Sequence, residues 1–265
     1  MQLVEFKNYK GEVLRGLLDK TNSKRGVIFL HGFERTGVEM KFKNLRDEIF
    51  RKVSVFRFDF SGCGLSDGKF EDVTVEKMTK ELGEAIELFK KLVPQLKEII
   101  LVGHSIAGCV TINFALKNPD SLFKIVLLGP ALNQQELLKY YSVRAKMWVQ
   151  KVFIDWNNFR QYFVPEEFVQ DLKIKKRMRK SHWISDKYFL ESKNRDYQKF
   201  IESISVIPQN ILIVHGDSDN KVPLESNNNL PKGLKFIKVI KGDHELERPD
   251  MVRQYLTKVI KFILK

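Results

Sequence analysis

The stretch that decides the fold is Ile99-Ile100-Leu101-Val102-Gly103-His104-Ser105-Ile106-Ala107-Gly108. Its first four residues form an apolar run typical of a buried strand, and the apolar residues after Gly108 suit a buried helix. The small residues Gly103 and Ala107 lie two positions before and two positions after Ser105. This spacing predicts a sharp turn between strand and helix, with the Ser105 hydroxyl at its apex. On this short pattern alone, an ordinary strand-to-helix turn is the alternative interpretation.

Length and composition indicate one large domain with room for an insertion. The chain has 265 residues, of which 43% are hydrophobic, which is enough for a sizeable core. Every apolar run is shorter than the roughly 20 residues that a membrane span needs. Residues 1–7 read as a charged strand and lack the apolar core of a signal peptide. We therefore expect neither a membrane span nor a signal peptide.

Cysteine usage predicts reduced thiols. The two cysteines, Cys63 and Cys109, are too few for a disulfide framework, and this pattern favours a cytoplasmic location. No Cys and His residues have the spacing of a zinc site. We therefore expect no metal and no cofactor.

The net charge of +13 raises the question of an anionic partner. Lysines are spread along the whole chain, and the one dense basic run occupies residues 173–180. We interpret this run as a solvated helix face, because no nucleic-acid-binding motif accompanies it. The expected partners therefore include no nucleic acid.

Short apolar runs alternate with helical patterns along most of the chain. The expected strands are residues 2–7, 13–20, 26–30, 54–60, 99–102, 123–128, 211–215 and 236–240. The expected helices are residues 38–52, a helix beginning at Thr74, the helix after Ser105 and residues 249–264. This alternation predicts an α/β fold with a mostly parallel eight-stranded sheet and helices on both faces.

The character of the sequence changes between residues 132 and 207. All three tryptophans, Trp148, Trp156 and Trp183, lie here among other aromatic and charged residues. Helical patterns dominate, so we predict an inserted, mainly helical cap at 132–207. The α/β core would then comprise residues 1–131 and 208–265. Because the insertion precedes the strand at 211–215, we expect the cap to cover the carboxyl edge of the sheet.

Several polar residues follow the ends of predicted parallel strands, and right-handed crossovers bring these ends to one edge. An acyl-transfer site needs a nucleophile, a base, a group that orients the base, and oxyanion donors. Ser105 is the candidate nucleophile. His244 is the candidate base, because it follows the last strand, as the chain order Ser, Asp, His requires. Asp217 and Asp219 follow the same strand, and the pattern alone leaves both open as the acid.

Two backbone N–H groups are the expected oxyanion donors. One belongs to Ile106, directly after Ser105, and the other to Phe33, in the loop after the strand at 26–30. His31 closes that strand, and we expect it to shape the loop.

Several motifs of the sequence resemble those of a known family. Residues 56–68 read FRFDFSGCGLSDG and resemble the R-F-D-F-x-G-x-G-x-S-D-G loop of α/β-hydrolases of the cinnamoyl and feruloyl esterase group, close to monoacylglycerol lipases. Residues 31–33 (HGF), 103–105 (GHS) and 129–131 (GPA) also match. The resemblance covers residues 1–131 and 208–265 but not the cap. Ala107 replaces the usual glycine, and Cys63 stands where the family often has histidine.

The resemblance also implies roles for individual residues. The family acid ends a G-x-x-D pattern that precedes a V-P step. Residues 216–219 read Gly-Asp-Ser-Asp and residues 222–223 read Val-Pro, so the resemblance implies Asp219 rather than Asp217. It likewise implies His244 as the base, and the N–H groups of Phe33 and Ile106 as oxyanion donors.

The predicted function is cofactor-independent hydrolysis of carboxylic esters through an acyl-serine intermediate. Candidate substrates are small-molecule acyl or hydroxycinnamoyl esters and monoacylglycerols. The same triad serves thioesterases, C–C hydrolases and peptidases, and a non-catalytic ligand-binding homologue is the alternative outside the enzymes. The sequence does not predict the oligomeric state.

Overall fold

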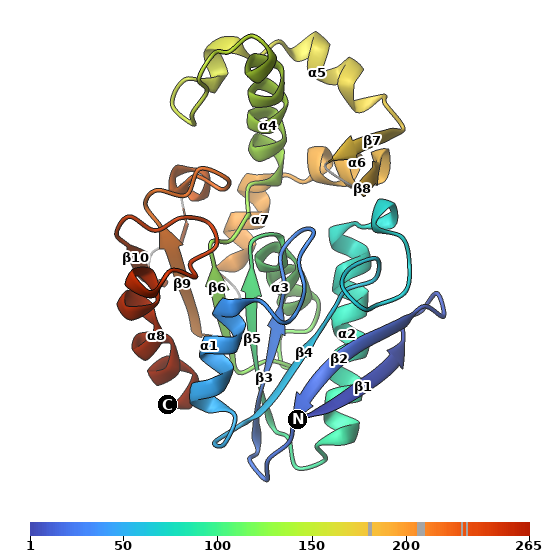
Figure 1. Cartoon of the computed structure of the whole chain (residues 1–265), viewed down its shortest axis with the longest axis vertical. Helices are drawn as coiled ribbons and strands as arrows, with labels where there is room; N and C mark the ends of the chain where they lie inside the picture. The colour runs from blue at the N-terminus through green and yellow to red at the C-terminus, as the bar shows by residue number, and fades with distance from the viewer. Residues whose placement is uncertain (180–181, 206–209, 229, 232) are drawn as a thin grey trace.

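The structure, a computed structural model, describes residues 1–179, 182–205, 210–228, 230–231 and 233–265. Its centre is an eight-stranded sheet with the strand order β1-β2-β4-β3-β5-β6-β9-β10 (Figure 1). The first two strands form an antiparallel hairpin, and β2 is also antiparallel to β4. All other neighbouring strands of this sheet are parallel. The prediction of a mostly parallel sheet after an opening hairpin is confirmed.

The predicted strands are all present, with ends that differ by no more than two residues. The strands of the sheet are β1 (Gln2–Lys7), β2 (Val13–Asp19), β3 (Arg25–Leu30), β4 (Ser54–Phe58), β5 (Glu98–His104), β6 (Lys124–Leu128), β9 (Asn210–Gly216) and β10 (Lys235–Val239). The flanking helices are α1 (Met40–Ile49), α2 (Val75–Leu92), α3 (Ile106–Lys117) and α8 (Pro249–Leu264), with the short helices η1 (Phe70–Asp72) and η3 (Leu224–Asn227).

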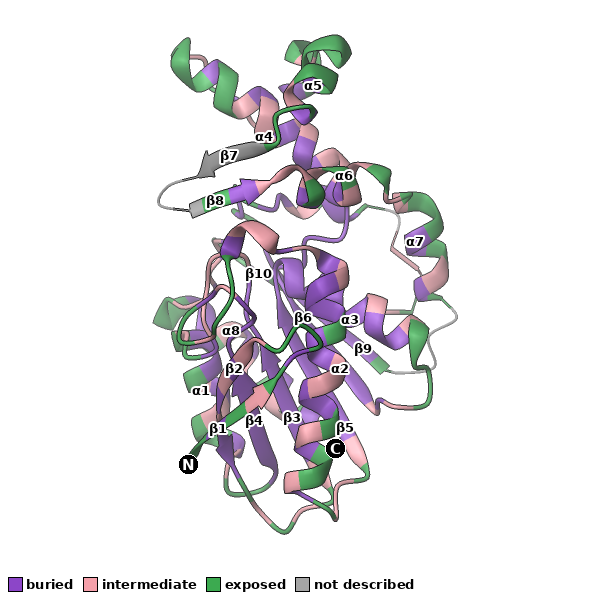
Figure 2. Cartoon of the chain, turned by 90° about the vertical axis from the view of Figure 1, so that its right-hand side faces the viewer, coloured by how far each residue is buried: buried purple, intermediate pink, exposed green. Residues whose placement is uncertain are grey.

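Strand β3 shows how the sequence builds two apolar layers. Val27 and Phe29 pack in the cluster that contains α1 and α8, whereas Ile28 and Leu30 pack in the cluster that contains α2 and α3. Because successive side chains of a strand face opposite sides, only an uninterrupted apolar run fills both layers. Figure 2 shows the buried strands enclosed between these helices.

Helix α2 begins and packs as its sequence predicts. The hydroxyl of Thr74 accepts a hydrogen bond from the backbone N–H of Lys77 at 3.0 Å and so caps the helix. Apolar residues three and four positions apart then form one buried stripe. The stripe consists of Val75, Met78, Leu82, Ile86 and Phe89.

The inserted segment rises above the carboxyl edge of the sheet (Figure 1). It contains α4 (Gln134–Val149), η2 (Phe159–Tyr162), α5 (Pro165–Leu172), β7 (Lys176–Arg179), β8 (His182–Ser185), α6 (Asp186–Asn194) and α7 (Tyr197–Ile204). Helices predominate, and β7 and β8 form a small antiparallel pair that the sequence did not suggest. The predicted limit at residue 207 lies outside the described residues, so the division of the chain at 132 and 207 stays a prediction.

The interpretation of the basic run as a helix face is wrong. Residues 176–179 form β7, in which Met178 pairs with Trp183 of β8. Pairing with a strand beyond the run decides the conformation here, and strand formation depends on such context more than helix formation does. Residue 180, the last of the run, lies outside the described residues.

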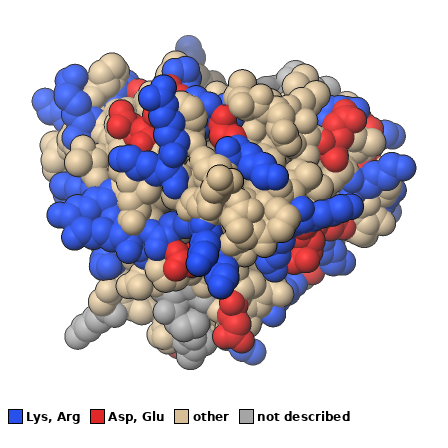
Figure 3. All heavy atoms as spheres, turned by 90° about the horizontal axis from the view of Figure 1, so that it is seen from below, with Lys and Arg blue, Asp and Glu red and all other residues tan. Residues whose placement is uncertain are grey.

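Basic side chains cover a large part of the surface. The underside of the molecule, opposite the inserted segment, displays many Lys and Arg side chains and fewer acidic ones (Figure 3). Among the helices that the structure describes, none has the length and apolar character needed to cross a membrane.

Candidate active site

Ser105 lies in the turn between β5 and α3 with a φ of 56° and a ψ of −121°. A non-glycine residue in this region costs on the order of 1–3 kcal/mol and is common at functional sites. The turn leaves no room for larger neighbours. A Cβ at Gly103 would lie 2.7 Å from the carbonyl oxygen of Ala107, and one at Gly108 would lie 2.7 Å from Cβ of Pro130. The predicted strand, sharp turn and helix are therefore present, with Ser105 at the apex.

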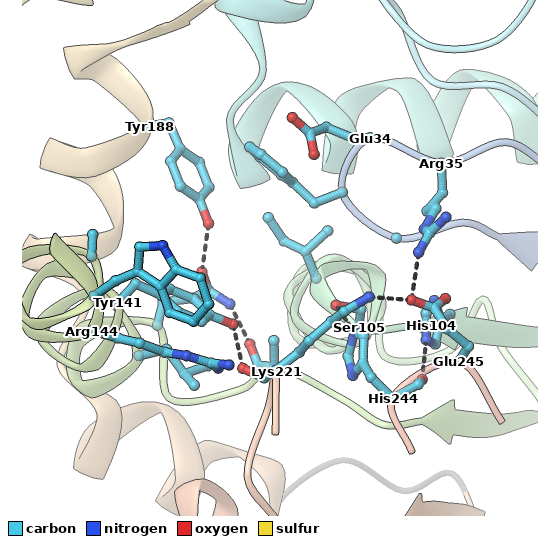
Figure 4. A pocket seen from close by; sticks show the side chains of 18 residues that line it. Glu34, Arg35, His104, Ser105, Tyr141, Arg144, Tyr188, Lys221, His244 and Glu245 are labelled. Atoms are coloured by element: carbon cyan, nitrogen blue, oxygen red, sulfur yellow. Dashed lines mark hydrogen bonds and ion pairs between the residues drawn. The ribbon is translucent and has the colours of Figure 1, made fainter. Parts of the chain in front are cut away.

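The structure brings Ser105, His244 and Asp219 into one chain of contacts. The Nε2 atom of His244 lies 3.0 Å from Oγ of Ser105, and its Nδ1 atom lies 2.7 Å from Oδ2 of Asp219 (Figure 4 labels Ser105 and His244). All three side chains are buried. The three residues follow the carboxyl ends of β5, β10 and β9, and so the sheet topology alone brings them to one edge.

The two candidate carboxylates have different surroundings. Asp217 is exposed and accepts a hydrogen bond from the hydroxyl of Ser218 at 3.1 Å. Asp219 is buried and contacts His244. The geometry therefore agrees with the choice that the family resemblance implied.

Backbone and side-chain donors hold the Asp219 carboxylate in place. Its Oδ1 atom accepts hydrogen bonds from the N–H groups of Lys221 and Val222, at 2.9 Å and 2.8 Å. Burial alone would raise the pKa of Asp219, but hydrogen bonds from His215 and His244 lower this pKa to about 2. The carboxyl group is therefore ionised at neutral pH.

The two expected oxyanion donors lie beside the serine. Phe33 and Ile106 both line the cavity that contains Ser105. Ile106 is the first residue of α3, so its N–H is among the helix N–H groups without an intrahelical acceptor. The ring of Phe33 lies 5.0 Å from the ring of Tyr188, which belongs to α6 of the inserted segment.

His31 ties the loop of Phe33 to the neighbouring loop. Its Nδ1–H donates to the carbonyl of Gly32 at 2.8 Å, and its Nε2 accepts from the N–H of Phe60 at 2.9 Å. Burial lowers the pKa of His31, which favours the neutral ring that these two roles require. His31 therefore shapes this loop, in agreement with the sequence-based expectation.

His104 is a further residue of the site, and the sequence pattern of the turn gave it no role. Its Nε2–H donates to the carbonyl of His244 at 2.9 Å, and the two ring centroids are 4.8 Å apart. Burial, together with the nearby charges of Lys41 and His244, lowers the pKa of His104 well below its usual value. The neutral ring holds the His244 backbone by a contact across 140 residues of sequence, which no local pattern could reveal.

The cavity at Ser105 extends along one face of α4 and has a volume of about 410 Å³. The α4 residues that line it are Gln134, Leu137, Tyr141, Arg144, Ala145 and Trp148. Their spacing of three and four residues places them on one face of the helix. At a rise of 1.5 Å per residue, this face runs for about 21 Å. We call this cavity the α4 groove; Figure 4 shows Tyr141 and Arg144 on its α4 side and Ser105 away from α4.

Cys63 and Cys109 are unpaired and buried. Burial raises the pKa of Cys63 to about 12 and the pKa of Cys109 to about 11. Neither thiol is therefore a nucleophile near neutral pH. In the part of the chain that the structure describes, no three His, Cys, Asp or Glu side chains group as metal ligands do.

We expect iodoacetamide to leave both thiols unmodified in the folded protein at mildly alkaline pH, because the reagent attacks only accessible thiolates. Mass spectrometry of the intact protein would measure the number of added groups. The control is the same reaction in concentrated guanidinium chloride, where both thiols should react. Rapid modification of Cys63 in the folded protein would contradict its buried, protonated state.

The sequence matches a known protein family and several known relatives. Residues 21–242 match the family described as serine aminopeptidase, S33 (Hydrolase_4). The uncharacterized hydrolase YugF of Bacillus subtilis is 23% identical, over 90% of each chain. The palmitoyl-protein thioesterase ABHD10 of Bos taurus is 33% identical over 41% of this chain, an alignment that spans 34% of that protein.

Solved structures with the same fold include two esterases or lipases from microorganisms. Est1E of Butyrivibrio proteoclasticus with bound ferulic acid has a TM-score of 0.73 and 22% identity, covering 98% of this chain and 96% of that one. The monoacylglycerol lipase of Paleococcus ferrophilus has a TM-score of 0.68 and 18% identity, and the match covers 95% of this chain and 98% of that one. With a family match across most of its length, the protein belongs to the serine aminopeptidase S33 family of hydrolases and has the α/β-hydrolase fold.

Proposed function

We propose that the protein is a serine hydrolase of carboxylic esters, with Ser105 as nucleophile, His244 as general base and Asp219 as the carboxylate that orients His244. The observation that carries the proposal is the unbroken pair of hydrogen bonds from Ser105 through His244 to Asp219. A serine hydroxyl is a weak nucleophile by itself, and a base within hydrogen-bond distance activates it. The positive φ of Ser105 and its place in the α4 groove add support.

The first half of the reaction forms the acyl-serine. His244 Nε2 takes the proton of the Ser105 hydroxyl while Oγ attacks the ester carbonyl carbon. The carbonyl oxygen gains negative charge, which the N–H groups of Phe33 and Ile106 stabilise. The imidazolium then gives its proton to the alcohol oxygen, and the bond between this oxygen and the acyl carbon breaks. Asp219 accepts a hydrogen bond from Nδ1–H throughout and remains ionised.

The second half releases the acid. His244 takes a proton from a water molecule, whose oxygen attacks the acyl-serine carbonyl carbon. The same two N–H groups stabilise the second oxyanion. When the bond to Oγ breaks, His244 returns the proton to Ser105 and the carboxylic acid leaves. Only groups of this chain and water are needed.

The α4 groove supports acyl esters as the substrate class. Leu137, Tyr141, Ala145 and Trp148 form the apolar part of its α4 side, which also carries Gln134 and Arg144. Apolar walls favour acyl chains or aromatic acids. Ferulic acid bound to Est1E and the name of the monoacylglycerol lipase agree with this class. We include hydroxycinnamoyl esters and monoacylglycerols in the proposal.

The two unpaired cysteines support a cytoplasmic location.

Acyl thioesters are a second candidate class. The similarity to a palmitoyl-protein thioesterase in sequence, and to mouse ABHD10 in fold at a TM-score of 0.70, favours them. The chemistry at Ser105 would be the same, with a thiol in place of the alcohol as leaving group.

A panel of substrates tests the proposal. We would measure kcat/KM for p-nitrophenyl esters from acetate to hexadecanoate, with a feruloyl ester, a monoacylglycerol, an acyl thioester and an aminoacyl p-nitroanilide. The proposal expects hydrolysis of esters, with a preference for chains that fill the α4 groove. Turnover of the anilide alone would overturn it and favour a peptidase, and turnover of the thioester alone would favour the second class.

Filling the α4 groove should shorten the acyl chains that the enzyme accepts. Ala145 lines the groove at its outer half, so Ala145→Trp would block it while leaving Ser105 accessible. Each buried methylene contributes about 0.8 kcal/mol. Losing contact with three of them would lower kcat/KM for hexadecanoate by roughly 50-fold, with acetate nearly unaffected.

The matched control is Gln150→Trp, because Gln150 ends the same helix and is exposed outside the groove lining. It should leave the chain-length profile unchanged. An Ala145→Trp variant with the wild-type profile would show that acyl chains do not follow α4.

A further inference from the structure

Three large apolar side chains are exposed at the outer end of α4 and in the turn after it. Val149, Trp148 and Phe153 are 82%, 80% and 79% exposed, the three highest values among the large apolar side chains that the structure describes. We call these three residues the cap-tip patch. The chain folds back here, since the N–H of Lys151 donates to the carbonyl of Trp148 at 3.1 Å. Exposed apolar patches on a protein surface are typical of sites that contact a protein or a membrane.

Three basic residues, Arg144, Lys146 and Lys151, lie on the outer half of α4 and in the turn that follows it. Arg144 donates to the backbone carbonyl of Asn220 at 2.6 Å and lies over the ring of Tyr140. Within the described residues, neither Arg144 nor the exposed Lys151 pairs with a carboxylate. Lys146 adds a third positive charge, although it pairs with Glu167. Three basic residues against the one carboxylate that pairs with them give this end of α4 a net positive charge.

The cap-tip patch is continuous with the α4 groove. Trp148 belongs to the patch and also lines the groove that leads to Ser105. Figure 1 shows α4 standing above the sheet, with its outer end at the far side of the molecule from both termini. A surface that contacts the patch would thus face the outer mouth of the groove.

We infer that the cap-tip patch docks on the surface of an anionic lipid bilayer. Exposed Trp and Phe side chains enter the interfacial region of a bilayer, and flanking Lys and Arg side chains attract anionic headgroups. A second copy of the chain fits less well, because each copy carries a net charge of +13 and the basic residues of α4 beside the patch. The docked orientation turns the groove mouth toward the lipid.

Sedimentation with lipid vesicles tests the inference. The vesicles contain equal amounts of phosphatidylglycerol and phosphatidylcholine, or phosphatidylcholine alone. We expect the wild type to bind the mixed vesicles about tenfold more tightly than the neutral ones. The variant Val149→Ser/Phe153→Ser should bind the mixed vesicles about tenfold more weakly than the wild type.

Two controls separate the cap-tip patch from other surfaces that could bind vesicles. Leu65→Ser removes an apolar side chain that is 71% exposed on a loop of the core, and it should not change binding. Val149 and Phe153 lie outside the groove lining, so their double variant should still hydrolyse soluble p-nitrophenyl acetate as the wild type does. Wild-type binding by this folded double variant would overturn the inference and assign binding to the basic underside (Figure 3).

Three further results distinguish the possible occupants of the patch. Equal binding to both kinds of vesicle would exclude recognition of anionic lipid. A dimer without lipid that the double variant abolishes would assign the patch to a second copy of the chain. Docking does not depend on Ser105, so Ser105→Ala should bind vesicles as the wild type does. An inactive protein that still binds through the patch would refute the proposed function and leave this inference intact.

Discussion

Replacing Ser105 by alanine is expected to lower kcat/KM for p-nitrophenyl esters by roughly 10⁴-fold or more, since no other group can form the acyl intermediate. His244→Ala should cause a loss of similar size, because Ser105 Oγ would lose the base that lies 3.0 Å away. Thermal unfolding of both variants should resemble that of the wild type, which would separate a chemical loss from a folding defect.

The double variant Ser105→Ala/His244→Ala gives the sharper test. Residues that act as one unit show grossly non-additive effects, so the double variant should lose little more than either single variant. Steady-state kinetics at high enzyme concentration would measure the residual rates. If the two losses multiplied, Ser105 and His244 would act independently and the proposed mechanism would be wrong.

The exchange Asp219→Asn is expected to lower kcat by about 10⁴-fold, because an amide cannot hold His244 in the tautomer that accepts the serine proton. The structure places Oδ2 of Asp219 2.7 Å from Nδ1 of His244. The loss should persist from mildly acidic to alkaline pH, since the pKa of about 2 keeps the wild-type carboxyl ionised over that range.

Asp217→Asn is the matched control, two residues away on the same loop. Asp217 is exposed and its side chain contacts the hydroxyl of Ser218, so the exchange should change kcat by less than about threefold. Rates of both variants across pH would be compared with the wild type. Equal losses, or a larger loss for Asp217→Asn, would move the acid to Asp217.

Much of the fold could be predicted because its signals are local. The run at 99–102 and its neighbours are apolar without interruption, as strands covered on both faces must be. The turn at Ser105 needs small residues two positions before and two positions after the serine, and the sequence carries Gly103 and Ala107 there. The prediction failed at residues 176–179, where pairing with β8 overrides the local pattern.

The sequence could not predict those features of the site that depend on where side chains point. Asp217 and Asp219 follow the same strand, and the pattern alone left both open until the family resemblance implied Asp219. In the structure, the N–H groups of Lys221 and Val222 hold the Asp219 carboxylate inward. The α4 groove depends on how a helix of the inserted segment stands over the sheet, which no periodicity fixes. The contact between His104 and His244 likewise joins distant parts of the chain.

The most direct test of the proposed catalytic site is covalent labelling with a fluorophosphonate, which reacts with a serine that a neighbouring base activates. Peptide mass spectrometry would locate the modified residue in the wild type, in Ser105→Ala and in His244→Ala. We expect one adduct, on Ser105 in the wild type, with none in Ser105→Ala and greatly slowed labelling in His244→Ala. An unlabelled wild type, or an adduct on another serine, would contradict the claim that Ser105, His244 and Asp219 form the catalytic site.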